Sequence, residues 1–157
     1  MEKVLTAHAS RIAWLIFGFF IIWSGLAVAA ALPGGSWLHR LFSPTCHQAP
    51  ERCYEFMGHP IGLCVRCLFI YLGLALGHPV FARWQLSEKN SLRLLGTAGF
   101  LVVADVLLES MGLYDNCKST RAVTGGLFGF ACAWFTLRGL SELSFNPEPK
   151  ITRHEST

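Results

Sequence analysis

Long apolar stretches alternate with short polar segments along this chain. The first stretch runs from Ile12 to Leu32, which is 21 residues without a charge between Arg11 and Pro33. A helix of about 20 residues crosses the roughly 30 Å hydrocarbon core of a bilayer. A cleaved signal peptide is the alternative, because small residues suitable for cleavage occur at Ala29 to Ala31. The run exceeds the ~7 to 15 residues of a signal core, however, so we expect a transmembrane helix.

Three further apolar stretches follow the first. We predict spans at Ile61 to Ala82, Leu94 to Leu113 and Ala122 to Leu137. The third contains Asp105 and Glu109, which are costly in lipid unless they face protein or water. The pattern predicts an all-α polytopic membrane protein with four transmembrane helices. These form a single domain over residues 1–140, followed by a polar cytoplasmic tail over residues 141–157.

Composition and charge agree with a membrane location and indicate an orientation. Hydrophobic residues make up 52% of the chain and charged residues only 15%, which is too apolar for an ordinary soluble domain. A net charge of +3 spread over loops does not suggest nucleic-acid binding. Eight Lys and Arg residues lie on the side of the termini, against five on the side of the first and third loops. The positive-inside rule therefore predicts a multi-pass protein of the plasma or inner membrane, with both termini cytoplasmic.

A dense group of cysteines lies in the first loop, on the predicted outer side. Cys46, His47, Cys64 and Cys67 supply a Cys3His set of the kind that binds zinc. Cys53 or His59 could substitute if the adjacent Cys46 and His47 do not both reach one ion. We therefore expect an outer-face site for a transition metal, zinc by preference, serving structure or metal handling.

The same cysteines have two other interpretations. Cys64 at the start of a helix beside Arg66 has the setting that stabilises a reactive thiolate, and it could exchange with Cys46 or Cys53. Alternatively, the four thiols form two inert disulfides that hold the loop to the membrane domain. Spacing alone leaves the connectivity open.

Polar residues within the last two spans form a second candidate site. Asp105 and Glu109 are four residues apart and share one face of a helix. Ionisable residues inside a membrane often serve function, here ion passage, proton relay or binding of a lipid head group. A structural pairing of Asp105 with Arg121 is the alternative. The catalytic candidates for a lipid head-group enzyme are Asp105, Asn116, Arg121 and Thr124.

Glycine pairs predict close helix packing. Gly73 with Gly77 and Gly125 with Gly129 each form a G-x-x-x-G motif, which lets backbones approach in lipid. We expect contacts within the chain, and a homo-oligomer through the same grooves is the alternative. Membrane lipid is the other expected partner.

Several of these residues together resemble a known family. The string Cys46-His47-Gln48-x-Pro50-x-Arg52, then Cys64-x-Arg66-Cys67 with Ile70-Tyr71-x-Gly73, then Asn116 ahead of Arg121-x-x-Thr124-Gly125 resembles an uncharacterised family of small prokaryotic membrane proteins, domain of unknown function 2085. The resemblance covers roughly Pro44 to Gly129 and implies a multi-span protein with no assigned reaction. Cys53 stands where the family typically has Ser, which leaves Cys46, His47, Cys64 and Cys67 as the expected metal set.

A looser resemblance is to membrane disulfide-generating oxidoreductases and vitamin K epoxide reductases. These have four-helix cores, outward cysteine pairs and a quinone cofactor. The resemblance implies that Cys64 and Cys67 would exchange with a second pair, for which Cys46 and Cys53 are available. Whether the protein is an enzyme stays open at this point.

Overall fold

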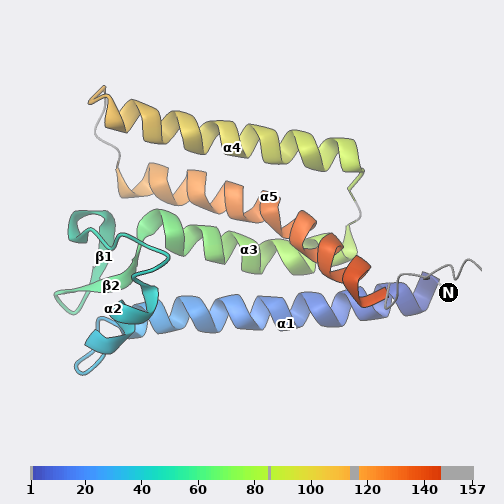
Figure 1. Ribbon diagram of the computed structural model, residues 1–157, viewed down its shortest axis with the longest axis horizontal. Coiled ribbons are helices and arrows are strands. Elements are labelled where there is room, and N and C mark those ends of the chain that lie inside the picture. Colours follow the sequence, from blue (N-terminus) through green and yellow to red (C-terminus); the bar gives the residue numbers. More distant parts are fainter. Residues whose placement is uncertain (1, 85, 114–116, 146–157) are drawn as a thin grey trace, which may run out of the picture.

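Long helices dominate the computed structural model, which describes the chain except for residues 1, 85, 114–116 and 146–157. For residues 2–9 and 141–145 it describes the backbone alone. The long helices of the described part are α1 (Glu2–Ala29), α3 (Val65–Arg83), α4 (Glu88–Ser110) and α5 (Lys118–Phe145) (Figure 1). Each contains a segment long and apolar enough to cross a membrane, namely Ser10–Ala29, Val65–Arg83, Glu88–Ser110 and Lys118–Leu140. The prediction of a four-span polytopic membrane protein is confirmed.

The helices lie side by side in an order that differs from their order in the chain. Helix α3 packs between α1 and α5, and α4 packs on α5 at the edge of the array (Figure 1). Helix α1 begins and α5 ends at the same end of the bundle. The segment between α1 and α3 covers the opposite end, which we call the cysteine end.

The helix bounds differ from the bounds of the predicted spans. The second span begins at Val65 rather than Ile61, because His59–Cys64 forms a strand. Helices α4 and α5 begin six and four residues earlier than predicted, at Glu88 and Lys118. Apolar patterning marks the part of a helix that lies in hydrocarbon, whereas the helix continues into the polar interface. Helix α5 also extends to Phe145, into the predicted tail, and residues 146–157 lie outside the described part.

The first loop is more ordered than the sequence indicated. It contains a short helix α2 (Ser36–Phe42), a 3-10 turn η1 (Pro50–Arg52) and two antiparallel strands, β1 (Cys53–Phe56) and β2 (His59–Cys64). Met57 and Gly58 join the strands with φ values of 53° and 79°. Such a two-residue turn with positive φ matches the twist of a hairpin. The membrane bundle therefore carries a small β-hairpin cap.

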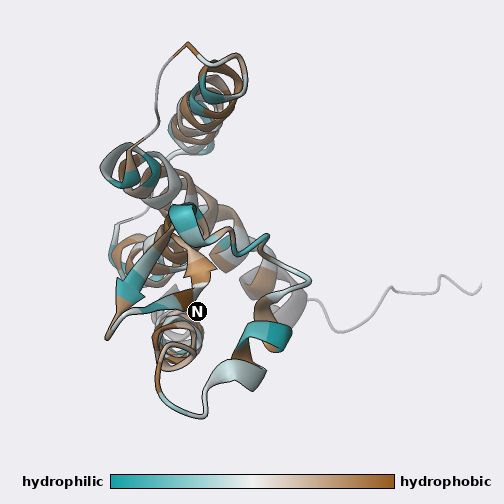
Figure 2. Ribbon diagram, turned by 90° about the vertical axis from the view of Figure 1, so that its left-hand side faces the viewer, coloured by the Kyte–Doolittle hydropathy of each residue, from teal (hydrophilic) through white to brown (hydrophobic). Residues whose placement is uncertain are grey.

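The cap packs on the end of α1 through its own apolar residues. Phe42 and Leu63 are fully buried, and the Trp23 ring of α1 meets Phe42 edge-on at 4.9 Å between centroids. Gly62 of β2 makes room for the Phe42 ring, because a Cβ at this position would lie 2.9 Å from the ring. Seen from the cysteine end, the cap also presents hydrophilic segments on α2 and β1 (Figure 2). One face of the cap is thus buried against α1, and its hydrophilic segments lie on another face.

Glycines allow α3 and α5 to pack at backbone contact. A Cβ at Gly73 would lie 2.3 Å from the carbonyl oxygen of Gly126, and one at Gly129 would lie 2.0 Å from that of Ile70. Gly77 and Gly125 are equally close to Ala133 and Arg66 of the facing helix. Both G-x-x-x-G grooves are therefore filled within one chain. A homo-oligomer through them remains an untested expectation.

Candidate metal centre

Three thiols converge where the cap meets α3. Cys46 follows α2, Cys64 ends β2 as the N-cap of α3, and Cys67 lies in the first turn of α3. Their Sγ atoms all lie within 4.8 Å of one another. In a tetrahedral zinc site with Zn–S bonds of 2.3 Å, two sulfurs are about 3.8 Å apart. A small contraction would bring the three sulfurs to metal-binding distance.

Local hydrogen bonds hold the Cys46 loop against the strand. Gln48 has a left-handed backbone with φ 49°, and its side-chain Nε2 donates to the carbonyl oxygens of His39 at 2.8 Å and Gly62 at 2.9 Å. These bonds join the loop to both α2 and β2. In addition, the backbone N–H of Cys64 donates to Sγ of Cys46 at 3.2 Å. The sequence analysis quoted Gln48 only as part of a motif and missed this positioning role.

Hydrogen bonding favours negative charge at the first of the three sulfurs. Hydrogen bonds from Cys64 and Cys67 lower the pKa of the Cys46 thiol, since they stabilise its thiolate. The pKa of Cys64 is raised, first because its thiol hydrogen-bonds to Cys46. Thiolates are the form that binds metals. Of the three sulfurs, Cys46 is therefore the one on which the surrounding hydrogen bonds favour the thiolate.

The histidines of the predicted set lie away from the cluster. Among the described residues, the three thiols form the group of candidate ligands, and His47 does not join it. The side chains of His47 and His59 are both exposed. Cys53, by contrast, is fully buried and lies opposite Cys64 in the hairpin. The structure brings together three of the four predicted ligands, Cys46, Cys64 and Cys67.

Charged residues of η1, α3, α4 and α5 form a second polar group. Arg66 of α3 forms an ion pair with Asp105 of α4 and lies 3.8 Å from Glu109. Arg121 of α5 pairs with Glu109, which also lies 3.2 Å from Arg52 at the end of η1. From the sequence, an Asp105–Arg121 pair is the alternative, but Asp105 pairs with Arg66 and Arg121 pairs with Glu109. The reason is that α3 contributes a second arginine to the group. We call these residues the arginine–carboxylate network: Arg52, Arg66, Asp105, Glu109 and Arg121.

The remaining catalytic candidates have different outcomes. Thr124 donates its hydroxyl to Thr120 O at 2.9 Å and lies 3.4 Å from Oδ2 of Asp105. Asn116 lies outside the described residues. Since Arg66 stands between Cys64 and Cys67, the network adjoins the thiol cluster along the chain. The two candidate sites of the sequence analysis thus lie at the same end of the bundle.

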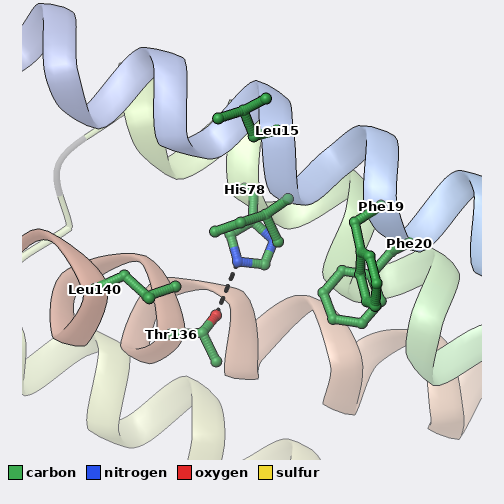
Figure 3. Close-up of a pocket in the computed structure, with 7 residues that line it drawn as sticks. Leu15, Phe19, Phe20, His78, Thr136 and Leu140 are labelled. Atoms are coloured by element: carbon green, nitrogen blue, oxygen red, sulfur yellow. Dashed lines mark hydrogen bonds between the residues drawn. The ribbon is translucent and has the colours of Figure 1, made fainter.

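A separate cavity of about 340 Å³ lies between α1, α3 and α5 (Figure 3). Its lining is apolar apart from His78 and Thr136 and comprises Leu15, Ile16, Phe19, Phe20, His78, Thr136 and Leu140. His78 is fully buried, with Nδ1 2.5 Å from Leu74 O and Nε2 2.9 Å from Thr136 Oγ1. It lies 11 residues after Cys67, about 16 Å along the helix at 1.5 Å per residue. The cavity is therefore not part of the thiol cluster.

Taken together, the helices and the cluster define a multi-pass membrane protein with a group of three thiols at one end. A family model described as "Predicted membrane protein", domain of unknown function 2085, matches residues 46–135, more than half of the chain. The chain belongs to this family. The match spans the thiol cluster, the arginine–carboxylate network and most of α5, which agrees with the resemblance found in the sequence.

Two archaeal relatives are similar to this chain. An uncharacterised protein of Methanocaldococcus jannaschii is 26% identical over 106 residues, which is 64% of this chain and 66% of that protein, just under two thirds of its length. An uncharacterised protein of Methanothermobacter thermautotrophicus is 32% identical over 98 residues, which is 60% of this chain and 86% of that protein. No solved structure matches the chain.

Proposed function

We propose that Cys46, Cys64 and Cys67 bind a transition metal, zinc by preference, at the outer face of the plasma or inner membrane. The observation that carries this proposal is the convergence of the three Sγ atoms to within 4.8 Å of one another. Cys64 and Cys67 are already close in sequence, and the fold brings Cys46, from the loop after α2, to them. The outer location follows from the excess of Lys and Arg at the other end of the bundle.

Zinc suits the chemistry of the site. Thiolates are strong ligands for zinc and for other soft or borderline metals. The N–H···S bond from Cys64 to Cys46 supports a charged sulfur without competing for the metal. A metal there would link the cap to α3 and so stabilise the fold. The alternative role is metal handling, in which a site at the membrane surface binds the ion and passes it on.

The test is the metal content of protein purified in detergent without a histidine tag. Mass spectrometry should find about one metal ion per chain, with all six cysteines titrating as thiols in denaturant with chelator. Cys46→Ser should lose the metal, whereas Cys117→Ser, which changes an exposed cysteine, should keep it. A metal-free protein lacking two to four titratable thiols would contradict the proposal and indicate disulfides.

A thiol-disulfide oxidoreductase is the second candidate, and one observation favours it. Cys64 is the N-cap of α3, where the helix dipole favours a thiolate although the hydrogen bond with Cys46 raises the pKa of Cys64, and Cys46 lies against both Cys64 and Cys67. Cys67→Ser, which removes the thiol that would resolve the intermediate, should then accumulate a mixed disulfide between Cys64 and the thiol of a substrate protein, visible on a non-reducing gel. The cavity near His78 is about 16 Å along α3 from Cys67, so a quinone there would not contact the thiols.

Within this proposal, the arginine–carboxylate network itself has a structural role. Asp105 and Glu109 each contact arginines from neighbouring helices, which neutralises their charge inside the membrane domain. A head-group enzyme would use the same residues. It predicts that Asp105→Asn or Arg121→Ala abolishes a lipid-dependent activity while the metal content stays intact.

A further inference from the structure

We infer that Cys53 supplies a fourth thiolate, so that the metal centre is a closed site with four sulfur ligands. This inference depends on the proposed metal-binding function and specifies its coordination. The three converging thiols supply three of the four ligands of a tetrahedral site and leave the fourth to be assigned. Cys53 lies outside the group of three sulfurs within 4.8 Å but belongs to the same packed core.

The hairpin register brings Cys53 to the cluster. Cys53 of β1 and Cys64 of β2 are paired directly across the antiparallel ladder. Side chains of directly paired residues lie on the same face, with Cβ atoms about 4.5 to 5.5 Å apart. The Cys53 side chain therefore lies on the same face of the hairpin as the Cys64 thiol, which is already in the cluster.

Burial separates Cys53 from the other candidates for the fourth position. Cys53 is 0% exposed and belongs to the same packed core as Cys46, with Cys64 and Cys67 against it. His47 and His59, in contrast, are exposed. An imidazole would have to turn inward from solvent to reach the metal, whereas the Cys53 side chain is already inside the core that contains the cluster.

The pairing of β1 with β2 is irregular next to Cys53. The ladder register shifts between Cys53 and Glu55, as at a β-bulge. Bulges loosen the pairing of a strand and change the direction of a side chain. Metal binding can therefore draw the Cys53 sulfur toward the other three without breaking the hairpin.

Positive groups around the site offset the charge of four thiolates. With Zn²⁺ the complete site carries two net negative charges, which is costly near hydrocarbon unless neighbours compensate. The N-terminus of α3 and the backbone N–H of Cys64 point at the cluster. Burial raises the pKa of the Cys53 thiol to about 11, whereas the charge of Lys118 favours its thiolate.

A closed site favours structure over metal exchange. A catalytic or transfer site keeps one coordination position open, whereas a structural zinc is bound by four protein ligands. Here the ligands would join the Cys46 loop, both strands and α3. The metal would then fasten the cap to the membrane bundle and would not be released readily.

X-ray absorption at the zinc edge of the unmodified full-length protein tests the inference. Four sulfur neighbours at about 2.3 Å are expected. Three sulfurs with one nitrogen or oxygen at about 2.0 Å would overturn the assignment of Cys53 while leaving the metal site in place. Protein without bound metal would instead overturn the proposed function, so the two failures are distinguishable.

Cobalt substitution of variants gives a second measurement. Cys53→Ser should bind Co²⁺ with a weaker sulfur-to-cobalt charge-transfer band than the unmodified protein, because one thiolate is lost. Cys117→Ser and His47→Ala are matched controls and should keep the unmodified spectrum. An unchanged band in Cys53→Ser, or a weakened one in His47→Ala, would contradict the inference.

Discussion

The backbone N–H of Cys64 donates a hydrogen bond to Sγ of Cys46 at 3.2 Å. This hydrogen bond connects Cys46 of the loop to the N-cap of α3 without a metal. A metal would strengthen the same connection, because it binds the folded protein and not the unfolded chain.

Metal removal should therefore destabilise the protein. If zinc is present at 1000 times its dissociation constant, its binding contributes about 4 kcal/mol to the free energy of unfolding. Adding a strong chelator should lower the midpoint of thermal unfolding in detergent. Cys46→Ser should unfold at one temperature with and without chelator. An equal response in both proteins would show that the chelator acts elsewhere.

Gln48→Glu should weaken the loop that carries Cys46. The substitution keeps the side-chain shape but replaces the Nε2 donor with an acceptor that faces the carbonyl oxygens of His39 and Gly62. Losing two hydrogen bonds of about 1 kcal/mol each should lower the free energy of unfolding by about 2 kcal/mol. Denaturant titration measures this loss. His47→Ala, at the exposed neighbouring position, should change it by less than about 0.5 kcal/mol.

Gly129→Ala should separate α3 from α5. Its Cβ would lie 2.0 Å from the backbone oxygen of Ile70, which cannot move without shifting the helix. Overpacking of this kind costs about 1 to 3 kcal/mol. Gly96→Ala in α4, where nothing lies within 4 Å, is the control and should be neutral or slightly stabilising. Unfolding in mixed detergent micelles compares the two, and similar values would rule out backbone contact at Gly129.

Breaking the Arg66–Asp105 ion pair should destabilise the bundle more than breaking an exposed pair. The Asp105 side chain is only 5% exposed, so Asp105→Ala leaves the partly buried Arg66 with the longer 3.8 Å contact to Glu109 and should cost about 3 kcal/mol. The double variant Arg66→Met with Asp105→Leu should recover most of the loss. Glu88→Gln is the control, because Glu88 is 67% exposed and 3.9 Å from Arg138, and it should cost less than about 0.5 kcal/mol. Equal losses would contradict a buried pair.

Cys117 should be the most reactive thiol toward maleimide. It is exposed and precedes α5, and the hydrogen bond with the Thr120 side chain lowers its pKa. Because the thiolate reacts, a lowered pKa brings half-maximal reactivity to a lower pH. Thr120→Val should move that midpoint upward, as measured by labelling rate against pH.

The same residue tests the membrane orientation. A membrane-impermeant maleimide added to intact cells should label Cys117 if the cysteine end faces outward, as the Lys and Arg distribution predicts. Cys117→Ser is the matched control for labelling of other cysteines. Labelling only after the cells are permeabilised would place the cysteine end in the cytoplasm.

The sequence by itself determined the number and approximate positions of the membrane helices. A run such as Ile12 to Leu32 needs no tertiary contact to be recognised, because the bilayer imposes both its length and its apolar character. The thiol group was also recognisable, since cysteines at this density are unusual and Cys64 and Cys67 are close in sequence. Helix ends were less certain, because apolar patterning stops where hydrocarbon stops and not where hydrogen bonding stops.

Only the tertiary structure decided which of these residues meet. Cys46 reaches Cys64 because Gln48 holds the loop on β2, and Cys53 lies opposite Cys64 because the hairpin sets the register. Asp105 faces Arg66 rather than Arg121, since α3 packs between α1 and α5 through glycines. Each of these contacts joins segments far apart in the chain, so it depends on packing and backbone direction that local patterns do not encode.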